Sequence, residues 1–268
     1  MGIILSGAKG AVACFKTAML KPVSHQKHAP TWLRPERPVI VNTTIPTTET
    51  LSRELGMTIH QQVSHAIDGL IACLPDPKQL SPELRRRIIA RYTAVLEGNF
   101  IYWMTGAYLS VRSEEARAKI LENLLEEVRD SHPRMLRTFT LCAHAAPTDA
   151  DAHAVHADLT NVRLFIGRLS PCRIVTMMAF FEGFIQKFMP YLAELAAMQG
   201  SSEFEYTDVH GVCDITHTQE LFNALTAEMA LHASDSASDL FEGVTLLSKL
   251  IRCIVDPAAE KAAFAQAS

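Results

Sequence analysis

Apolar residues recur every three or four positions through most of the chain from Glu49 onward, and alternating strand-like runs are nearly absent. This spacing gathers apolar side chains on one face of a helix, whereas a strand needs alternation at every second residue. The sequence therefore predicts an all-α fold. We expect helices at about residues 49–74, 82–109, 114–131, 134–144, 149–168, 171–198, 205–232 and 236–254.

The distribution of helix breakers divides the chain into two regions. Residues 21–48 are rich in Pro, His and Thr and show little periodicity, which predicts an irregular N-terminal arm over residues 1–48. Residues 49–268 form the expected helical domain, and a chain of 268 residues is long enough to bury one full core. Within this domain, Ser81, Pro82 and Glu83 predict a helix start, because they supply a capping hydroxyl, a first-turn proline and an acid near the positive end of the dipole.

Composition argues against several classes of partner. The 25 Lys and Arg residues against 29 Asp and Glu give no basic field for a phosphate backbone, so we expect no nucleic-acid partner. No stretch has the roughly 20 uncharged apolar residues of a membrane-spanning helix, so we expect no membrane partner. The six cysteines are scattered without a CxxC pair, which is typical of reduced thiols. We therefore expect a soluble, cytoplasmic protein.

The most specific motif is HGVCDITH at residues 210–217, in which His210, Asp214 and His217 are separated by four and then three positions. Such spacing places all three on one helical face, with Cys213 on another. Two imidazoles and a carboxylate suit a first-row metal such as iron. The alternative is a polar, solvated helix face on which the histidines have no metal to bind, and the motif alone leaves both readings open.

Two acids, Glu97 and Glu182, lie within otherwise apolar segments. An ionised carboxylate in such surroundings needs a partner, and a metal ion can accept several carboxylates at once. The alternative for each acid is a place at the edge of the apolar face, paired with Lys or Arg. The neighbouring aromatic residues either wall a substrate pocket or fill the core: Phe100, Tyr102, Trp103, Phe180, Phe181 and Phe184.

A third motif, ENLLEEVRDSHP at residues 122–133, places several acids before His132. On an ideal helix, Glu127 and His132 are separated by about 140°, so they converge only if the helix deforms between them. Pro133 favours such a deformation, because it disfavours the α conformation at His132 and removes a backbone donor. Glu122 or Glu126 could take the place of Glu127, and the whole stretch could instead be a solvated acidic turn.

Together these motifs supply four carboxylates and three histidines spread over four helices. Four carboxylates would nearly neutralise two divalent ions, which is what a buried site of low dielectric tolerates. The candidate metal ligands are Glu97, Glu127, His132, Glu182, His210, Asp214 and His217.

This set of motifs, over roughly residues 80–255, resembles the heme-oxygenase-like diiron oxidases, a superfamily that includes fatty-acid decarboxylases, amino-acid-fragmenting enzymes and N-oxygenases. The resemblance implies a heme-oxygenase-like helical bundle of about seven core helices, with a diiron domain at residues 49–268. It disfavours true heme oxygenase and the thiaminase-like branch. It also implies that Glu127 bridges the metals, with His132, Glu182 and His210 on one iron and Glu97, Asp214 and His217 on the other.

The resemblance further implies two Fe(II) ions as cofactors and O2 as a co-substrate. We expect N-oxygenation of a small amine or amino-acid-derived substrate in a biosynthetic pathway, with oxidative decarboxylation or C–C fragmentation of an amino or fatty acid as the alternative reactions. No catalytic residue beyond the metal ligands, and no residue that binds an organic cofactor, is expected. An electron donor and a homodimer are left open as partners. The opposing class is a non-catalytic helical binding protein.

Overall fold

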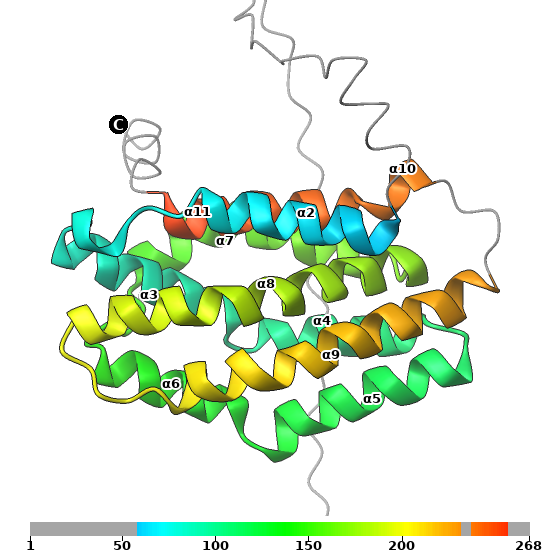
Figure 1. The fold of residues 1–268 in the computed structure, drawn as a ribbon, viewed down its shortest axis with the longest axis horizontal. Coiled ribbons are helices and arrows are strands. Elements are labelled where there is room, and N and C mark those ends of the chain that lie inside the picture. Colours follow the sequence, from blue (N-terminus) through cyan, green and yellow to red (C-terminus); the bar gives the residue numbers. More distant parts are fainter. Residues whose placement is uncertain (1–57, 232–236, 257–268) are drawn as a thin grey trace, which may run out of the picture. The chain divides into compact units, whose positions relative to one another are not determined.

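The computed structural model describes residues 58–231 and 237–256. The expected arm at residues 1–48 and its boundary therefore lie outside the described residues. Within the described ranges all regular structure is helical, which confirms the all-α fold (Figure 1). The elements are α2 (Ile59–Ala72), a short 3-10 turn η1 (Pro77–Gln79), α3 (Pro82–Leu96), α4 (Asn99–Ser110), α5 (Glu114–Arg129), α6 (His132–Cys142), α7 (Asp149–Ile166), α8 (Pro171–Met198), α9 (Glu205–Met229), α10 (Ala237–Leu240) and α11 (Glu242–Val255).

The predicted start of α3 is confirmed in detail. The Ser81 side chain accepts a hydrogen bond from the Leu84 backbone N–H at 3.2 Å, Pro82 opens the helix, and Glu83 lies in its first turn. These features satisfy a free donor and complement the helix dipole. The N-terminal end of α3 is therefore fixed by local sequence alone.

The single helix expected at residues 82–109 is wrong, because the structure divides it into α3 and α4 at Glu97 and Gly98. Gly98 has φ 75°, a left-handed conformation that glycine adopts without the steric cost of a side chain. Glu97 has extended backbone at the C-cap of α3 and is exposed to solvent. The break therefore moves Glu97 out of the helix interior in which the sequence analysis placed it.

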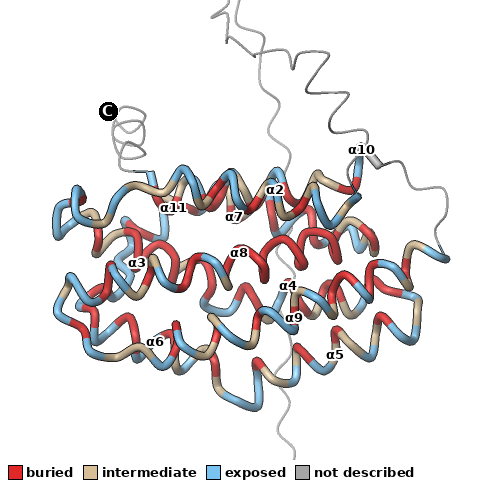
Figure 2. Tube along the Cα trace, in the orientation of Figure 1, coloured by how far each residue is buried: buried red, intermediate tan, exposed pale blue. Residues whose placement is uncertain are grey.

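Helix α8 is the centre of the helical unit. It is buried along most of its length (Figure 2) and packs against α9, α2, α4, α3 and α11. Helix α9 in turn packs against α5 and α6, so that these three helices run together beside α8 (Figure 1). Every sequence-predicted metal ligand except Glu97 lies on one of these four helices: α5, α6, α8 or α9.

A buried carboxylate joins the end of α9 to the start of α5. Glu228, which is 0% exposed, accepts backbone hydrogen bonds from Arg112 at 3.0 Å and from Ser113 at 2.9 Å. Ser113 itself caps α5 by accepting from the Ala116 N–H. An anion at these backbone donors is stabilised by the N-terminal end of α5, so the contact fixes the two helices to each other at this end.

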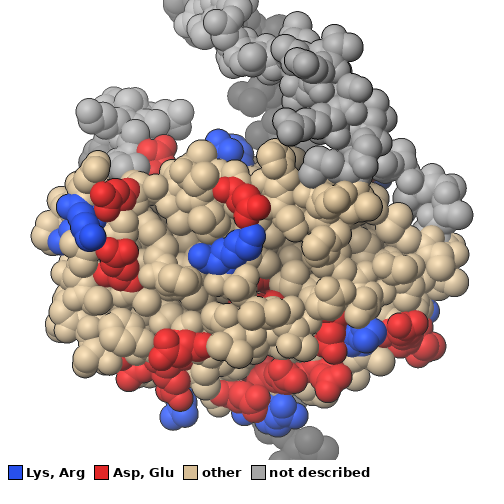
Figure 3. Space-filling model, in the orientation of Figure 1, with Lys and Arg blue, Asp and Glu red and all other residues tan. Residues whose placement is uncertain are grey.

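Charged side chains on the face drawn in Figure 3 are interspersed, with most visible basic groups of the described residues next to acidic ones. An ion pair between Lys187 and Asp68 joins α8 to α2, with an N–O distance of 2.6 Å. Among the described residues, no helix combines the length and the hydropathy that crossing a membrane requires.

Candidate metal centre

A short turn at Asp130 and Ser131 separates α5 from α6, and this turn forms the first part of the centre. Ser131 adopts φ 62°, and α6 begins at His132 with Pro133 in its first turn. As a result, Nδ1 of His132 lies 2.7 Å from Oε1 of Glu127. The predicted convergence of these two side chains through a helix break is confirmed.

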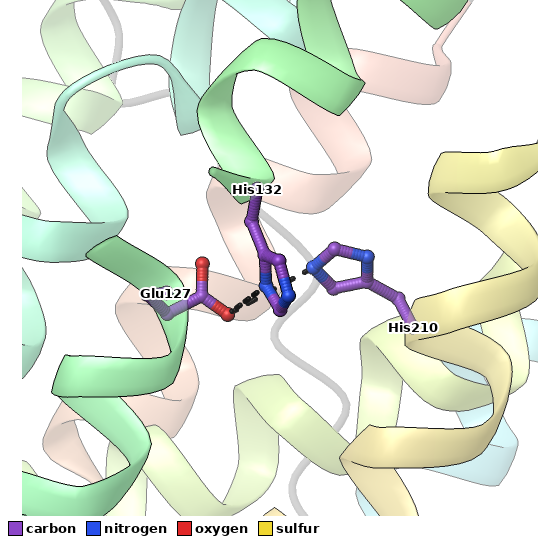
Figure 4. A group of neighbouring side chains, drawn as sticks. All are labelled: Glu127, His132 and His210. Atoms are coloured by element: carbon purple, nitrogen blue, oxygen red, sulfur yellow. Dashed lines mark hydrogen bonds and ion pairs between the residues drawn. The ribbon is translucent and has the colours of Figure 1, made fainter. Parts of the chain in front are cut away.

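His210 on α9 completes this first group (Figure 4). Its Nε2 lies 3.8 Å from Oε1 of Glu127, and its ring centroid is 4.6 Å from that of His132. Its other ring nitrogen, Nδ1, lies 2.8 Å from the backbone carbonyl oxygen of Tyr206. Because a carbonyl only accepts, Nδ1 carries the hydrogen, and the Nε2 lone pair is left facing the carboxylate.

A second group is built one and two turns further along α9. Nδ1 of His217 lies 3.6 Å from Oδ1 of Asp214 and 3.8 Å from Oε2 of Glu182 on α8. The other oxygen of Glu182, Oε1, accepts a hydrogen bond from Asn123 on α5 at 3.0 Å. Asp214, Glu182 and His217 are respectively 0%, 1% and 3% exposed, so all three are shielded from water.

Two buried polar atoms in this second group have no hydrogen-bond partner among the described residues. They are Oδ2 of Asp214 and Nδ1 of His217. Leaving such atoms unpaired costs about 1–3 kcal/mol each, more when the group is charged. A cation bound between them would satisfy both, and a set of imidazole nitrogens and carboxylate oxygens suits iron. The residues present therefore fit a metal centre.

The pKa values of the buried acids reflect the lack of solvent and the crowding of negative charge. Burial raises the pKa of Glu127. Burial and then the nearby charge of Glu182 raise the pKa of Asp214 well above its ordinary value. Both shifts oppose ionisation, and a bound cation would reverse them because it favours the charged forms.

The two histidines of α9 have opposite pKa shifts. Burial, followed by the nearby charge of His132, lowers the pKa of His210 to about 4, so its imidazole is neutral at pH 7. Burial alone would also lower the pKa of His217, but its interactions with Asp214, Glu182 and Glu126 outweigh burial and raise the pKa to about 11. The neighbouring carboxylates therefore favour the protonated form of His217.

Glu97 is the one predicted ligand that the structure does not bring to the others. Its side chain is 39% exposed and forms an ion pair with Arg137 of α6. The cause is the break at Gly98, which places Glu97 outside both helices. Its assignment as a ligand stays a prediction.

Glu97 nevertheless lines a pocket that leads to the first group. The pocket is also lined by Glu127, His132 and His210, and by apolar side chains that include Phe100 and Ile185. Of the aromatic residues considered from the sequence, Phe100 alone lines this pocket, Trp103, Phe180, Phe181 and Phe184 are buried in the core, and Tyr102 is 43% exposed.

Sequence reasoning gave no role to the residues that surround the two groups. Tyr206 packs its ring 4.3 Å from that of His210 and shares a 2.8 Å hydrogen bond between hydroxyls with the buried Tyr92. Asn123 and Tyr92 carry no spacing signal, because tertiary packing alone brings them to the centre. The expectation that Cys213 faces away from Asp214 is wrong, since its Sγ donates to Oδ1 of Asp214 at 3.2 Å.

Comparison with known protein families shows to which family the chain belongs. Residues 87–251 match the family described as iron-containing redox enzymes. The chain belongs to this family. The match spans all seven predicted ligands, from Glu97 to His217, and it agrees with the heme-oxygenase-like resemblance. Neither curated proteins nor solved structures gave a match. Membership of the iron-containing redox enzymes makes iron the metal that these side chains would hold.

Proposed function

We propose that this iron-containing redox enzyme is a non-heme diiron oxygenase that activates O2 to oxidise a small amine or amino-acid-derived substrate. The observation that carries the proposal is the presence of two adjacent groups of possible metal ligands, one at Glu127, His132 and His210 and the other at Cys213, Asp214 and His217, of which all but Cys213 are buried. Glu182 lies beside the second group, 3.8 Å from His217. Two groups of this kind supply ligands for two ions, whereas a single ion would leave buried negative charge uncompensated.

In this proposal the six buried side chains hold the two ions, and Glu97 completes the set only by exchanging Arg137 for metal. When bound, the irons supply the redox capacity and Lewis acidity that side chains lack. The carboxylates set the charge of the centre, and the histidines fix its geometry. The buried surroundings exclude water from the reacting atoms.

The pocket beside the first group supports the choice of an amine substrate. Its walls are largely apolar and include Glu97, whose carboxylate would attract a positively charged amine once it leaves Arg137. N-oxygenation is the reaction that we favour for such a substrate. Oxidative decarboxylation and C–C fragmentation at the same centre are the other outcomes that a product analysis would distinguish.

Metal loading tests the proposal. We expect about two irons per chain after anaerobic addition of Fe(II) and desalting, and O2 uptake that rises when an amine or amino acid is present. His217→Ala and Asp214→Ala should each lose one iron and the O2 uptake while the helical circular dichroism is kept. His153→Ala, which removes an exposed histidine of α7, is the matched control. No iron in the loaded wild-type protein would end the proposal, and unchanged O2 uptake in both alanine variants would end the ligand assignment.

A further inference from the structure

The two histidines of α9 turn different ring nitrogens toward the buried carboxylates. In His210, Nε2 faces Glu127, while Nδ1 is held by the Tyr206 carbonyl at 2.8 Å. In His217 the arrangement is reversed. Its Nδ1 faces Asp214 and Glu182, while Nε2 lies 2.9 Å from Oε2 of Glu126.

Hydrogen-bond chemistry fixes which nitrogen of His217 is available. An ionised carboxylate only accepts hydrogen bonds, so Nε2 of His217 carries a hydrogen and donates it to Glu126. Once the imidazole is neutral, the lone pair is at Nδ1, which is the buried atom without a hydrogen-bond partner among the described residues. The only nitrogen that can bind a metal in this arrangement is therefore the one beside Asp214 and Glu182.

We propose that Glu126 is a positioning residue that holds Nε2–H of His217, so that His217 binds its metal through Nδ1 while His210 binds through Nε2. The inference rests on the proposed metal centre. Histidines that bind metals commonly donate their second N–H to a carboxylate or a backbone carbonyl, which fixes the tautomer and the ring orientation. Glu126 fills this role for His217, as the Tyr206 carbonyl does for His210.

The geometry separates this role from that of a direct ligand. The two nitrogens of an imidazole ring diverge, so a carboxylate hydrogen-bonded at Nε2 cannot share an ion with Asp214 and Glu182 on the Nδ1 side. Glu126 is also 33% exposed at its side chain, whereas Glu127 is 5% exposed. Glu127 therefore points into the centre, while its neighbour Glu126 reaches the outer edge of His217.

The coordinating nitrogen can be read directly by NMR. The full chain would be labelled with ¹⁵N-histidine and loaded with Zn(II), a diamagnetic probe that accepts the same nitrogen and oxygen ligands. His210→Ala and His217→Ala spectra would assign the two rings. We expect long-range ¹H–¹⁵N spectra to show His217 metal-bound at Nδ1 and protonated at Nε2, with the reverse for His210. Binding of His217 through Nε2 would overturn the inference and leave the metal centre intact.

Variants of Glu126 test its role independently of activity. Glu126→Leu should weaken Zn(II) binding by about 10–100-fold, as is usual when such a partner of a ligating histidine is lost. Glu126→Gln should weaken it less, because the amide oxygen still accepts from Nε2–H. Glu115→Gln, an equal charge change on the exposed face of the same helix, should bind as the wild type does.

These experiments distinguish failure of the positioning role of Glu126 from failure of the proposed metal centre. Unchanged affinity and unchanged His217 signals in Glu126→Leu would overturn the positioning role, and complete loss of one Zn(II) would instead make Glu126 a ligand. If neither histidine of the wild-type protein binds Zn(II) or Fe(II), the metal centre itself falls. Should Glu126→Leu fail to fold, the wild-type spectrum decides the question alone.

Discussion

Glu127 and His132 are five positions apart in sequence, yet Oε1 of Glu127 lies 2.7 Å from Nδ1 of His132. An uninterrupted helix would separate the two side chains by about 140°. Ser131, at φ 62°, turns the chain so that His132 starts a new helix on the side of Glu127. The first half of the metal centre therefore depends on one backbone conformation.

This dependence predicts different effects on stability for two substitutions at Ser131. Ser131→Gly should change the free energy of unfolding by less than about 1 kcal/mol, because relief of the left-handed backbone offsets the greater freedom of glycine in the unfolded chain. Ser131→Val should destabilise by about 1–3 kcal/mol, because a β-branched residue resists this conformation. Urea unfolding and Zn(II) titration measure both effects. A valine variant with wild-type stability and metal affinity would show that the turn does not set the site.

The pKa of His217, raised to about 11, predicts how metal binding depends on pH. Metal must displace a proton from His217 throughout pH 6–8, so affinity should rise with pH by about tenfold per unit for each proton released. His210, with its pKa near 4, adds no such dependence in this range. Competition titrations with a chelator of known affinity would measure the slope. A flat profile would contradict a protonated His217 in the metal-free protein.

The raised pKa of His217 also predicts how the stability of the metal-free protein depends on pH. Metal affinity should rise with pH, whereas this stability should fall. Because the folded pKa of His217 is above its ordinary value of 6.5, the stability from this group is fully present below pH 6.5 and is lost as pH rises toward 11. Unfolding of the metal-free protein should therefore become easier at alkaline pH. His217→Ala should remove this part of the dependence, while His153→Ala should keep it.

The ion pair between Glu97 and Arg137 makes the assignment of Glu97 testable. If Glu97 joins the metal centre, it must first leave Arg137, so Arg137→Ala should tighten binding of the second ion. An exposed pair contributes at most about 1 kcal/mol, which limits the gain to about fivefold. Metal titration of Arg137→Ala against Arg134→Ala measures it. Equal affinities would leave Glu97 outside the metal ligands.

The hydrogen bonds that Glu228 accepts from Arg112 and Ser113 predict that this buried side chain is needed for stability. Glu228→Gln should destabilise the protein by about 1–3 kcal/mol. The amide removes the negative charge, and its NH2 group would face the backbone N–H groups of Arg112 and Ser113, which need an acceptor. Thermal and urea unfolding would measure the loss. Glu220→Gln, a less buried acid on the same helix, should stay near the wild type. Equal stabilities for the two variants would refute the role of Glu228.

Local sequence signals were enough where the determinants lie close together in the chain. Ser81 and Pro82 fixed the start of α3, and Pro133 indicated the helix break that brings His132 to Glu127. The spacing of His210, Asp214 and His217 also predicted that they share one face of a helix, and the structure shows that this face of α9 is buried. In each case the physical cause acts over one or two helical turns.

Other features depended on contacts between distant segments. Gly98 offered no signal beyond its identity, since a glycine within an apolar helical pattern is often tolerated, yet here it ends α3 and exposes Glu97. Similarly, the sequence offered Glu126 only as an alternative to Glu127, and its contact with His217 depends on the packing of α5 against α9. Asn123 joins the centre because α8 brings Glu182 to it. The spacing of residues within one helix cannot show which other helix packs against it.

Helices α5 and α9 are joined at Glu228, while Glu127 and His210 lie near the other end of the pair. Fourteen residues of helix separate Ser113 from Glu127, which corresponds to roughly 20 Å. The two helices are therefore held together at one end by Glu228 and carry the candidate metal ligands near the other end. A slight separation of the helices at the ligand end would widen the gap between Glu127 and His210, while the contact of Glu228 would keep the helices in register.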